Sequence, residues 1–162
     1  SNYTGRFARF DATLELDPAN PANCRVEATI DASSLEADNP PAGFLDALRG
    51  VDWLDAAKFP RMTFKTTKVE VTGAKTARIT GDFWLHGVTR PVVLEAIHNG
   101  GYGSHAYDPG GSRIGFSARG TLNRSEFGIA YGIPAPGSTL GVSDAVEFII
   151  EAEFLRPAPA AR

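Results

Sequence analysis

The feature that most constrains the fold of this chain is an alternation of apolar and polar residues with a period of two. It is clearest near the C-terminus, where Glu147, Glu151, Glu153 and a single Ile149 alternate with the apolar residues Val146, Phe148, Ile150, Ala152 and Phe154. Successive side chains of a β-strand point to opposite faces of the sheet. This segment therefore predicts a strand with one apolar face, and a fold that buries this face away from solvent.

The same pattern returns in six more segments, which are separated by Gly, Pro, Asn and Asp. These segments are residues 10–16, 24–31, 62–71, 77–86, 92–97 and 114–122. In the third of them the phase of the alternation changes at Thr66-Thr67, which indicates a β-bulge. Most of the connections are short, so sequential strands should pair antiparallel as a meander.

Seven strands are one fewer than an up-and-down barrel with room for a small ligand usually has. The predicted fold is therefore an all-β, eight-stranded, antiparallel lipocalin-like barrel, of which this chain shows seven strands and whose first strand would precede Ser1. The inward set mixes large side chains with the small residues Ala12, Ala28, Ala77, Gly81, Ala118, Gly120 and Ala152. Such a set could interdigitate into a solid core or leave a tunnel, and the sequence leaves both open.

Residues 39–57 interrupt the alternation. There Phe44, Leu45 and Leu48, followed by Trp53, Leu54 and Ala57, have helical spacing and predict one or two short helices. Helices between β-hairpins would either form a lid over one barrel end or plug it. We expect residues 1–156 to form a single domain and residues 157–162, which are rich in Pro and Ala, to be a mobile tail that forms no ladder.

Composition excludes several classes of function. The 162 residues carry 16 basic and 19 acidic side chains, a net charge of -3, which disfavours a nucleic-acid partner. Cys24 is the only cysteine, so neither an internal disulfide nor a thiolate zinc site of the usual kind can form. No run reaches the roughly 18 apolar residues that span a bilayer. The chain opens without a signal peptide and without Met, so an upstream segment could have been removed.

The residues that suggest catalysis or metal binding have simpler interpretations. His86, His98 and His105 do not lie at paired i, i+2 positions on one strand, so no metal site is predicted. Residues 115–120 lie inside an alternating strand rather than at a strand-to-helix turn, so they are no nucleophile elbow. Residues 100–103 are predicted to be a hairpin loop, because no helix or phosphate-binding lysine follows. We therefore predict no enzyme activity and no cofactor.

Six stretches, in order along nearly the whole chain, resemble the YceI-like lipid- and polyisoprenoid-binding family. They are residues 3–12, the Thr-Ile-Asp-x-x-Ser element of 28–35, the Phe-Pro signature of 52–64, the Gly-Val-Thr-Arg-Pro-Val corner of 85–92, the Arg-Ser-x-Phe-Gly motif within 115–128, and 142–146. The resemblance implies an eight-stranded barrel around a long apolar pocket for a polyisoprenoid, in a periplasmic or secreted protein. It also implies that the family's first strand is absent here, which leaves an open edge for pairing with a second copy.

The leading hypothesis is therefore that the barrel binds, transports or sequesters a quinone or a polyprenyl phosphate. Residues predicted to contact the tail are Phe10, Leu14, Ile30, Phe64, Ile79, Phe83, Phe116 and Phe148, with Phe44 and Trp53 near the entrance. Plain core packing is the alternative for each. Arg124 could meet an anionic head group, or could tie strand ends through Asp31 or Asp144.

Two other hypotheses belong to different classes. One is a structural barrel with a filled core that forms a homodimer through an edge strand. The other is a haem- or metal-dependent barrel that uses His86.

Overall fold

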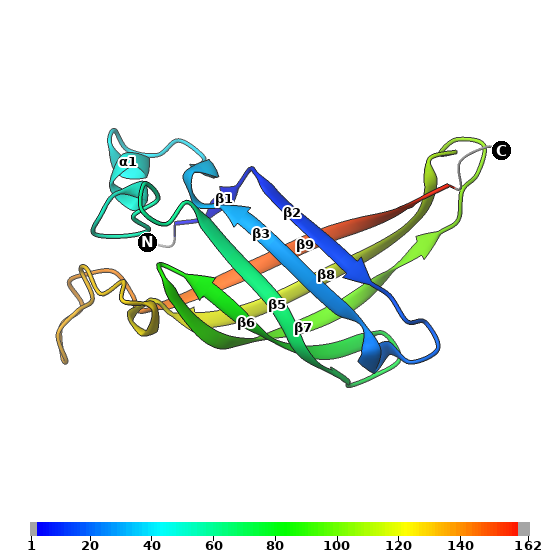
Figure 1. Cartoon of the computed structure of the whole chain (residues 1–162). Helices are drawn as coiled ribbons and strands as arrows, with labels where there is room; N and C mark the ends of the chain where they lie inside the picture. The colour runs from blue at the N-terminus through cyan, green and yellow to red at the C-terminus, as the bar shows by residue number, and fades with distance from the viewer. Residues whose placement is uncertain (1–2, 159–162) are drawn as a thin grey trace.

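The main sheet has seven strands, and each is antiparallel to its neighbour in the order β2-β3-β5-β6-β7-β8-β9. The structure is a computed structural model that describes residues 3–158. Figure 1 shows the strands wrapping into a nearly closed barrel. The strand bounds are β2 Phe10–Glu15, β3 Arg25–Asp31, β5 Arg61–Val71, β6 Thr76–Leu85, β7 Val88–Tyr102, β8 Gly111–Asn123 and β9 Ala145–Pro157. The predicted all-β barrel with seven visible strands is confirmed.

The remaining elements gather largely at one end of the barrel. Strands β1 (Gly5–Phe7) and β4 (Leu35–Ala37) form a small antiparallel ribbon that the alternation pattern did not predict. One α-helix, α1 (Phe44–Arg49), lies at the same end (Figure 1). Three short 3-10 turns are η1 (Pro21–Asn23), η2 (Ala32–Ser34) and η3 (Arg124–Phe127). Of the one or two helices predicted within 39–57, only α1 forms, and the Trp53 region folds as turns.

The register shows which side chains share the inner face of the sheet. Phe64 on β5 pairs with Ala28 on β3 and with Phe83 on β6, and all three follow the predicted phase. Past Thr66 the register shifts, so that Val69 pairs with Ile79. This is the predicted bulge, and it keeps the apolar residues of β5 on one face across the change of phase. At the bulge the Thr66 hydroxyl links β5 to β3 in place of backbone hydrogen bonds. It accepts from the backbone N–H of Val26 and donates to the carbonyl of the same residue.

Two predictions about strand ends are wrong. Residues 100–102 are not part of a hairpin loop, because β7 continues to Tyr102 after a second bulge between His98 and Gly100. The ladder at the C-terminus also reaches Pro157, which pairs with Gly111. Proline is tolerated there because β9 is an edge strand, whose outward side needs no N–H donor. The end of the predicted tail, residues 159–162, lies outside the described residues.

The most tightly buried residues gather at the end of the barrel that carries α1. Phe127 is 1% exposed and Ile129 is 4% exposed, and both come from the segment that follows β8. They pack with Ala32, Ala56, Met62 and Leu85, and Trp53 and Leu54 lie against this cluster. The segment around Trp53 therefore acts as a plug of this end.

The barrel has one seam. Within residues 3–158 the sheet order ends at β2 on one side and at β9 on the other, and no ladder joins these two strands. Both edges expose side chains from the inner face, because no strand covers them. Phe10 on β2 is 63% exposed and Ile150 on β9 is 39% exposed.

Candidate ligand-binding site

The candidate site is the inner face of the seven-stranded sheet. Eight of the residues predicted to contact a lipid tail lie on this face, as the pairing register shows: Phe10, Leu14, Ile30, Phe64, Ile79, Phe83, Phe116 and Phe148. Of these only Phe64 is buried, and the others are half-buried or exposed. In a completely filled core nearly all such side chains would be buried. The inner face is therefore apolar and only partly covered.

Two glycines on this face decide how the aromatic rings lie. A Cβ atom placed on Gly120 would collide with Cζ of Phe148, and one placed on Gly81 would collide with Cζ of Phe64. Each ring therefore rests directly on the glycine of the neighbouring strand. At these two points the small residues do not create a tunnel by themselves, because they provide the space in which a ring packs against the wall.

The two aromatic residues predicted near the entrance lie in the layer at the α1 end. Trp53 contacts Tyr131 edge-on, with ring centroids 5.7 Å apart. Phe44, on α1, lies 4.9 Å from the ring of Tyr3. Neither residue belongs to the inner face of the sheet. Their use as ligand contacts stays a prediction.

Arg124 is the buried cation of this end, with only 4% of its surface exposed. Its guanidinium donates to four backbone carbonyls, those of Ser143, Ile129, Tyr131 and Val142, at 2.7–3.0 Å. It also lies 4.7 Å from the ring of Trp53. Burial of the guanidinium lowers the pKa of Arg124. These contacts hold the loop from Ile129 to Ser143 over the barrel end, and they use four of the five N–H donors that an anionic head group could otherwise engage.

The two predicted carboxylate partners of Arg124 are engaged elsewhere. Asp144 accepts hydrogen bonds from the hydroxyl and the backbone N–H of Ser125, at 2.7 and 2.8 Å, and these bonds lower the pKa of the Asp144 carboxyl. Asp31 pairs with Arg9. Arg124 therefore does tie strand ends together, but through carbonyl oxygens, which a search for opposite charges in the sequence does not find.

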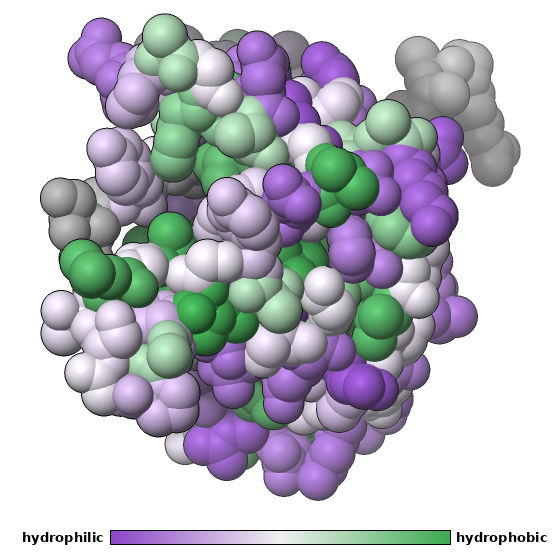
Figure 2. Space-filling view, turned by 90° about the vertical axis from the view of Figure 1, so that its left-hand side faces the viewer, coloured by the Kyte–Doolittle hydropathy of each residue, from purple (hydrophilic) through white to green (hydrophobic). Residues whose placement is uncertain are grey.

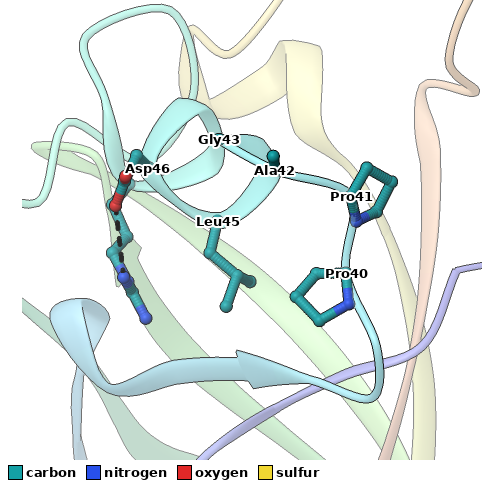
Figure 3. Close-up of a pocket in the computed structure, with 7 residues that line it drawn as sticks. Pro40, Pro41, Ala42, Gly43, Leu45 and Asp46 are labelled. Carbon is teal, nitrogen blue, oxygen red and sulfur yellow. Dashed lines mark ion pairs between the residues drawn. The ribbon is translucent and has the colours of Figure 1, made fainter.

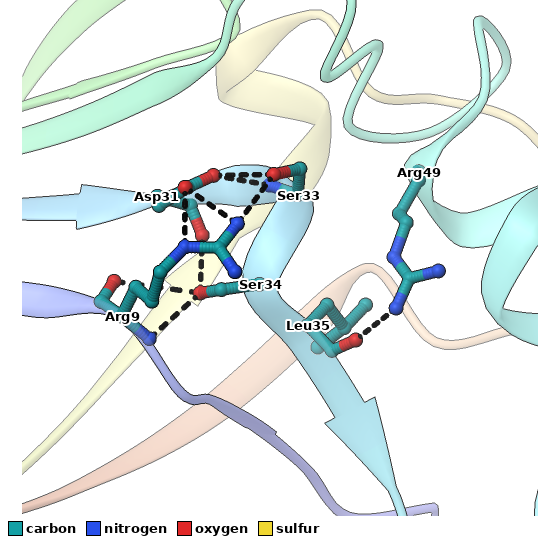
Figure 4. Close-up of polar contacts among 6 residues, drawn as sticks. All are labelled: Arg9, Asp31, Ser33, Ser34, Leu35 and Arg49. Carbon is teal, nitrogen blue, oxygen red and sulfur yellow. Dashed lines mark hydrogen bonds and ion pairs between the residues drawn. The ribbon is translucent and has the colours of Figure 1, made fainter.

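Asp31 and Arg9 form a second polar cluster where β3 ends (Figure 4). Asp31 accepts from the hydroxyl of Ser33 at 2.6 Å, and Arg9 Nη2 lies 2.8 Å from Asp31 Oδ2. The hydrogen bond from Ser33, followed by the one from Arg9, lowers the pKa of Asp31 to about 2. Ser34 accepts from the backbone N–H of Arg9. The Thr-Ile-Asp-x-x-Ser element thus fixes the chain between β1 and β2 to the end of β3.

Two surface recesses lie outside the inner face. One of about 320 Å³ is lined by residues 40–43 together with Leu45, Asp46 and Arg49 of α1 (Figure 3). The other, of about 510 Å³, lies over the polar cluster of Arg9 and Asp31 beside Phe10 and Arg61. Figure 2 views the α1 end, where hydrophobic and pale residues occupy much of the middle and strongly hydrophilic ones lie mainly toward the margins.

The three histidines lie in three different elements of the fold. His86 stands in the turn between β6 and β7, where its Nδ1 is 3.1 Å from the carbonyl of Phe127. His105 lies in the loop after β7, and His98 lies on the inner face of β7. Among the described residues, no group of three or more His, Cys, Asp or Glu side chains could hold a metal ion. Within the same part of the chain, no helix is long and apolar enough to cross a membrane.

A family model described as the YceI-like domain matches residues 1–154. The chain belongs to the YceI-like family. The resemblance found in the sequence is thereby confirmed. The family is known for polyisoprenoid-binding barrels and is not a known enzyme family.

Relatives and solved structures agree with this assignment. A UPF0312 protein of Pseudomonas syringae pv. syringae is 38% identical over 136 residues, which are 83% of this chain and 66% of that protein. The chain thus spans slightly less than two thirds of that relative. The crystal structure of the Campylobacter jejuni YCEI protein covers 98% of this chain and 87% of its own, with 30% identity and a TM-score of 0.81. Burkholderia cenocepacia BcnA covers 93% of this chain and 86% of its own, with 25% identity and a TM-score of 0.76.

Proposed function

We propose that this YceI-like barrel binds a polyisoprenoid or a similar amphiphilic lipid along its inner face, and so transports or sequesters it. The observation that carries the proposal is the partly covered apolar face. Its residues face inward in register on all seven strands, yet Ile30, Ile79, Phe83, Phe116 and Phe148 are only half-buried. A flexible hydrocarbon chain laid along this face would complete the packing.

The energy of such binding comes from the tail. Each methylene-sized group removed from water contributes about 0.8 kcal/mol. Several isoprene units therefore exceed the association cost of ~4–15 kcal/mol without any specific contact. A protein of this kind solubilises its ligand, because side chains replace water around the tail. A quinone or a polyprenyl phosphate has a tail of this type, and a periplasmic or secreted location is where such a carrier would operate.

Extraction of the purified protein with organic solvent tests the proposal directly. Mass spectrometry should find a polyprenyl lipid in the extract, in an amount comparable to the protein. Ala118 is buried on the inner face and Arg119, its neighbour, points outward and is exposed. Ala118→Phe should therefore abolish lipid recovery, and the matched control Arg119→Phe should retain it. If the wild-type extract holds no lipid and added polyprenol does not bind, the proposal fails.

A further inference from the structure

His98 on β7 is a half-buried polar residue of the inner face, and its ring has one buried nitrogen without a hydrogen-bond partner among residues 3–158. Its neighbours along the inner face of β7 are the buried Val92, Leu94 and Ala96. The Nε2 atom of His98 is buried and makes no hydrogen bond among the described residues. Thr66, a buried polar side chain of the same face, is engaged with the backbone of Val26. A buried polar atom without a partner costs free energy, so His98 needs an explanation.

The surroundings of His98 fix the position of its ring. Its ring lies against that of Phe116, its pairing partner on β8, with centroids 5.4 Å apart. Phe116 is in turn held edge-on by Phe154 on β9, at 6.2 Å. The next inward residues on the neighbouring strands are Ala77, Ala118 and Ala152. An imidazole in this setting is positioned for one hydrogen bond. Lys75, opposite His98 on the β6 side, accepts the backbone N–H of His98 through its carbonyl at 2.8 Å and is itself exposed to solvent, whereas Nε2 of His98 is buried.

The position of His98 along the barrel also matters. It lies ten residues after Val88, the first residue of β7 at the plugged α1 end, which is roughly 30 Å along a strand. The segment around Trp53, packed against Phe127 and Ile129, thus closes one end, and His98 lies toward the other. A lipid whose tail ran toward the plug would bring its polar end to the region of His98.

We infer that His98 binds the head group of the ligand, and that this head group is uncharged and bears a hydroxyl or carbonyl oxygen. The inference rests on the proposed lipid-binding function and specifies the class of its ligand. A neutral imidazole nitrogen donates to a carbonyl or accepts from a hydroxyl, according to its tautomer. Either bond would satisfy Nε2 without bringing a charge into an apolar setting.

Three probes with the same kind of tail test the inference: a polyprenol, the matching polyprenyl phosphate, and squalene, which has no polar group. In His98→Leu the affinity for the polyprenol should fall about 3- to 10-fold, as expected for the loss of one neutral hydrogen bond. The affinity for squalene should not fall, which also shows that the variant is folded. His105→Leu is the matched control, since His105 is exposed in the loop after β7. Addition of polyprenol should also shift the imidazole NMR signals of His98.

The outcomes separate the inference from the function on which it rests. If wild-type protein binds none of the three probes, the lipid-binding function itself fails. If the probes bind but His98→Leu changes the affinities for polyprenol and squalene equally, or changes neither, His98 is not the head-group contact. If the phosphate binds more tightly than the alcohol and depends on His98, the head group is an anion and the inference is overturned.

Discussion

At the scale of single residues, the end of the barrel depends on groups whose role is to satisfy the backbone. Arg124 shows this most clearly, because its donors reach carbonyls as far along the chain as Ser143. The sequence could mark Arg124 as unusual through its Arg-Ser-x-Phe-Gly context. It could not identify the partners, because backbone carbonyls are present at every residue and only the path of the loop selects four of them.

Replacement of Arg124 should destabilise the fold strongly. Arg124→Leu leaves the four carbonyls without their donor, and we expect the free energy of unfolding to fall by ~2–4 kcal/mol. Arg124→Lys should recover little, because an ammonium is a point charge that cannot reproduce the planar fork. Urea denaturation measures the free energy of unfolding of both variants. Arg119→Leu, at an exposed position, should change stability by less than ~0.5 kcal/mol, and a loss as small as this for Arg124→Leu would contradict the role assigned to Arg124.

Asp31 should make the stability of the protein depend on acid pH. Its carboxyl has a pKa of about 2 in the folded protein, below the ordinary value of 3.8, because Ser33 and Arg9 bond its ionised form. The unfolded chain therefore takes up this proton first as the pH falls. The contribution of the ionised Asp31 carboxyl to the free energy of unfolding is fully present above about pH 5, and it is lost as the pH falls from about 4 toward 2.

The comparison that checks this is denaturation of wild type and Asp31→Asn across that range. The free energy of unfolding of wild type should exceed that of Asp31→Asn by a constant amount near neutral pH, and this difference should become smaller in acid. Asp11→Asn is the control, since the Asp11 carboxylate makes no hydrogen bond to any described residue and lies on the adjacent strand β2. A difference for Asp31→Asn that stays constant down to pH 2 would contradict the account.

At the scale of the elements, the pairs of glycine and phenylalanine on neighbouring strands set the shape of the inner face. Gly120→Ala should lower the free energy of unfolding by ~1–3 kcal/mol, because its Cβ would collide with the ring of Phe148 and would lie 2.8 Å from the carbonyl oxygen of Val93. Thermal or chemical denaturation measures the loss. Gly115→Ala on the same strand is the control, since its Cβ would find no atom closer than 3.9 Å. Equal effects at the two positions would show that the ring contact is unimportant.

The strands also show which features of the fold the alternation pattern predicts and which it misses. The alternation predicted all seven strands of the main sheet, and the phase change at Thr66 marked the bulge in β5. It missed the ribbon of β1 and β4, because three-residue strands are too short to show a period. The predicted end of β7 is too early, because glycines such as those at 100 and 101 are typical of a turn, whereas here they continue the ladder after a bulge.

The same limit explains why His98 was not among the predicted site residues. It continues the alternation of Val92, Leu94 and Ala96, so the pattern itself contained the signal. The predicted strand ends at residue 97, so His98 falls just outside the alternating segment. The apolar residues of the site were easier to predict, because hydrophobic alternation is the same property that places them on the inner face.

At the scale of the whole molecule, the barrel has two different ends and one seam. The α1 end is closed by Phe127, Ile129 and the segment around Trp53, and it is held by Arg124. The seam between β2 and β9 leaves inner residues such as Phe10 accessible. An open edge of this kind could pair with another strand, and a homodimer formed there stays a prediction.

The central claim, that a lipid lies along the inner face, is tested most directly by methyl NMR during titration with a polyprenol. Neighbouring residues on the same strand provide internal controls, since Ile150 points inward and Ile149 outward, and Val92 and Val93 are related in the same way. The account predicts that signals of Ile79, Val92, Leu94 and Ile150 shift with ligand while those of Val93, Ile97 and Ile149 do not. Shifts confined to the outward methyls, or equal on both faces, would contradict it.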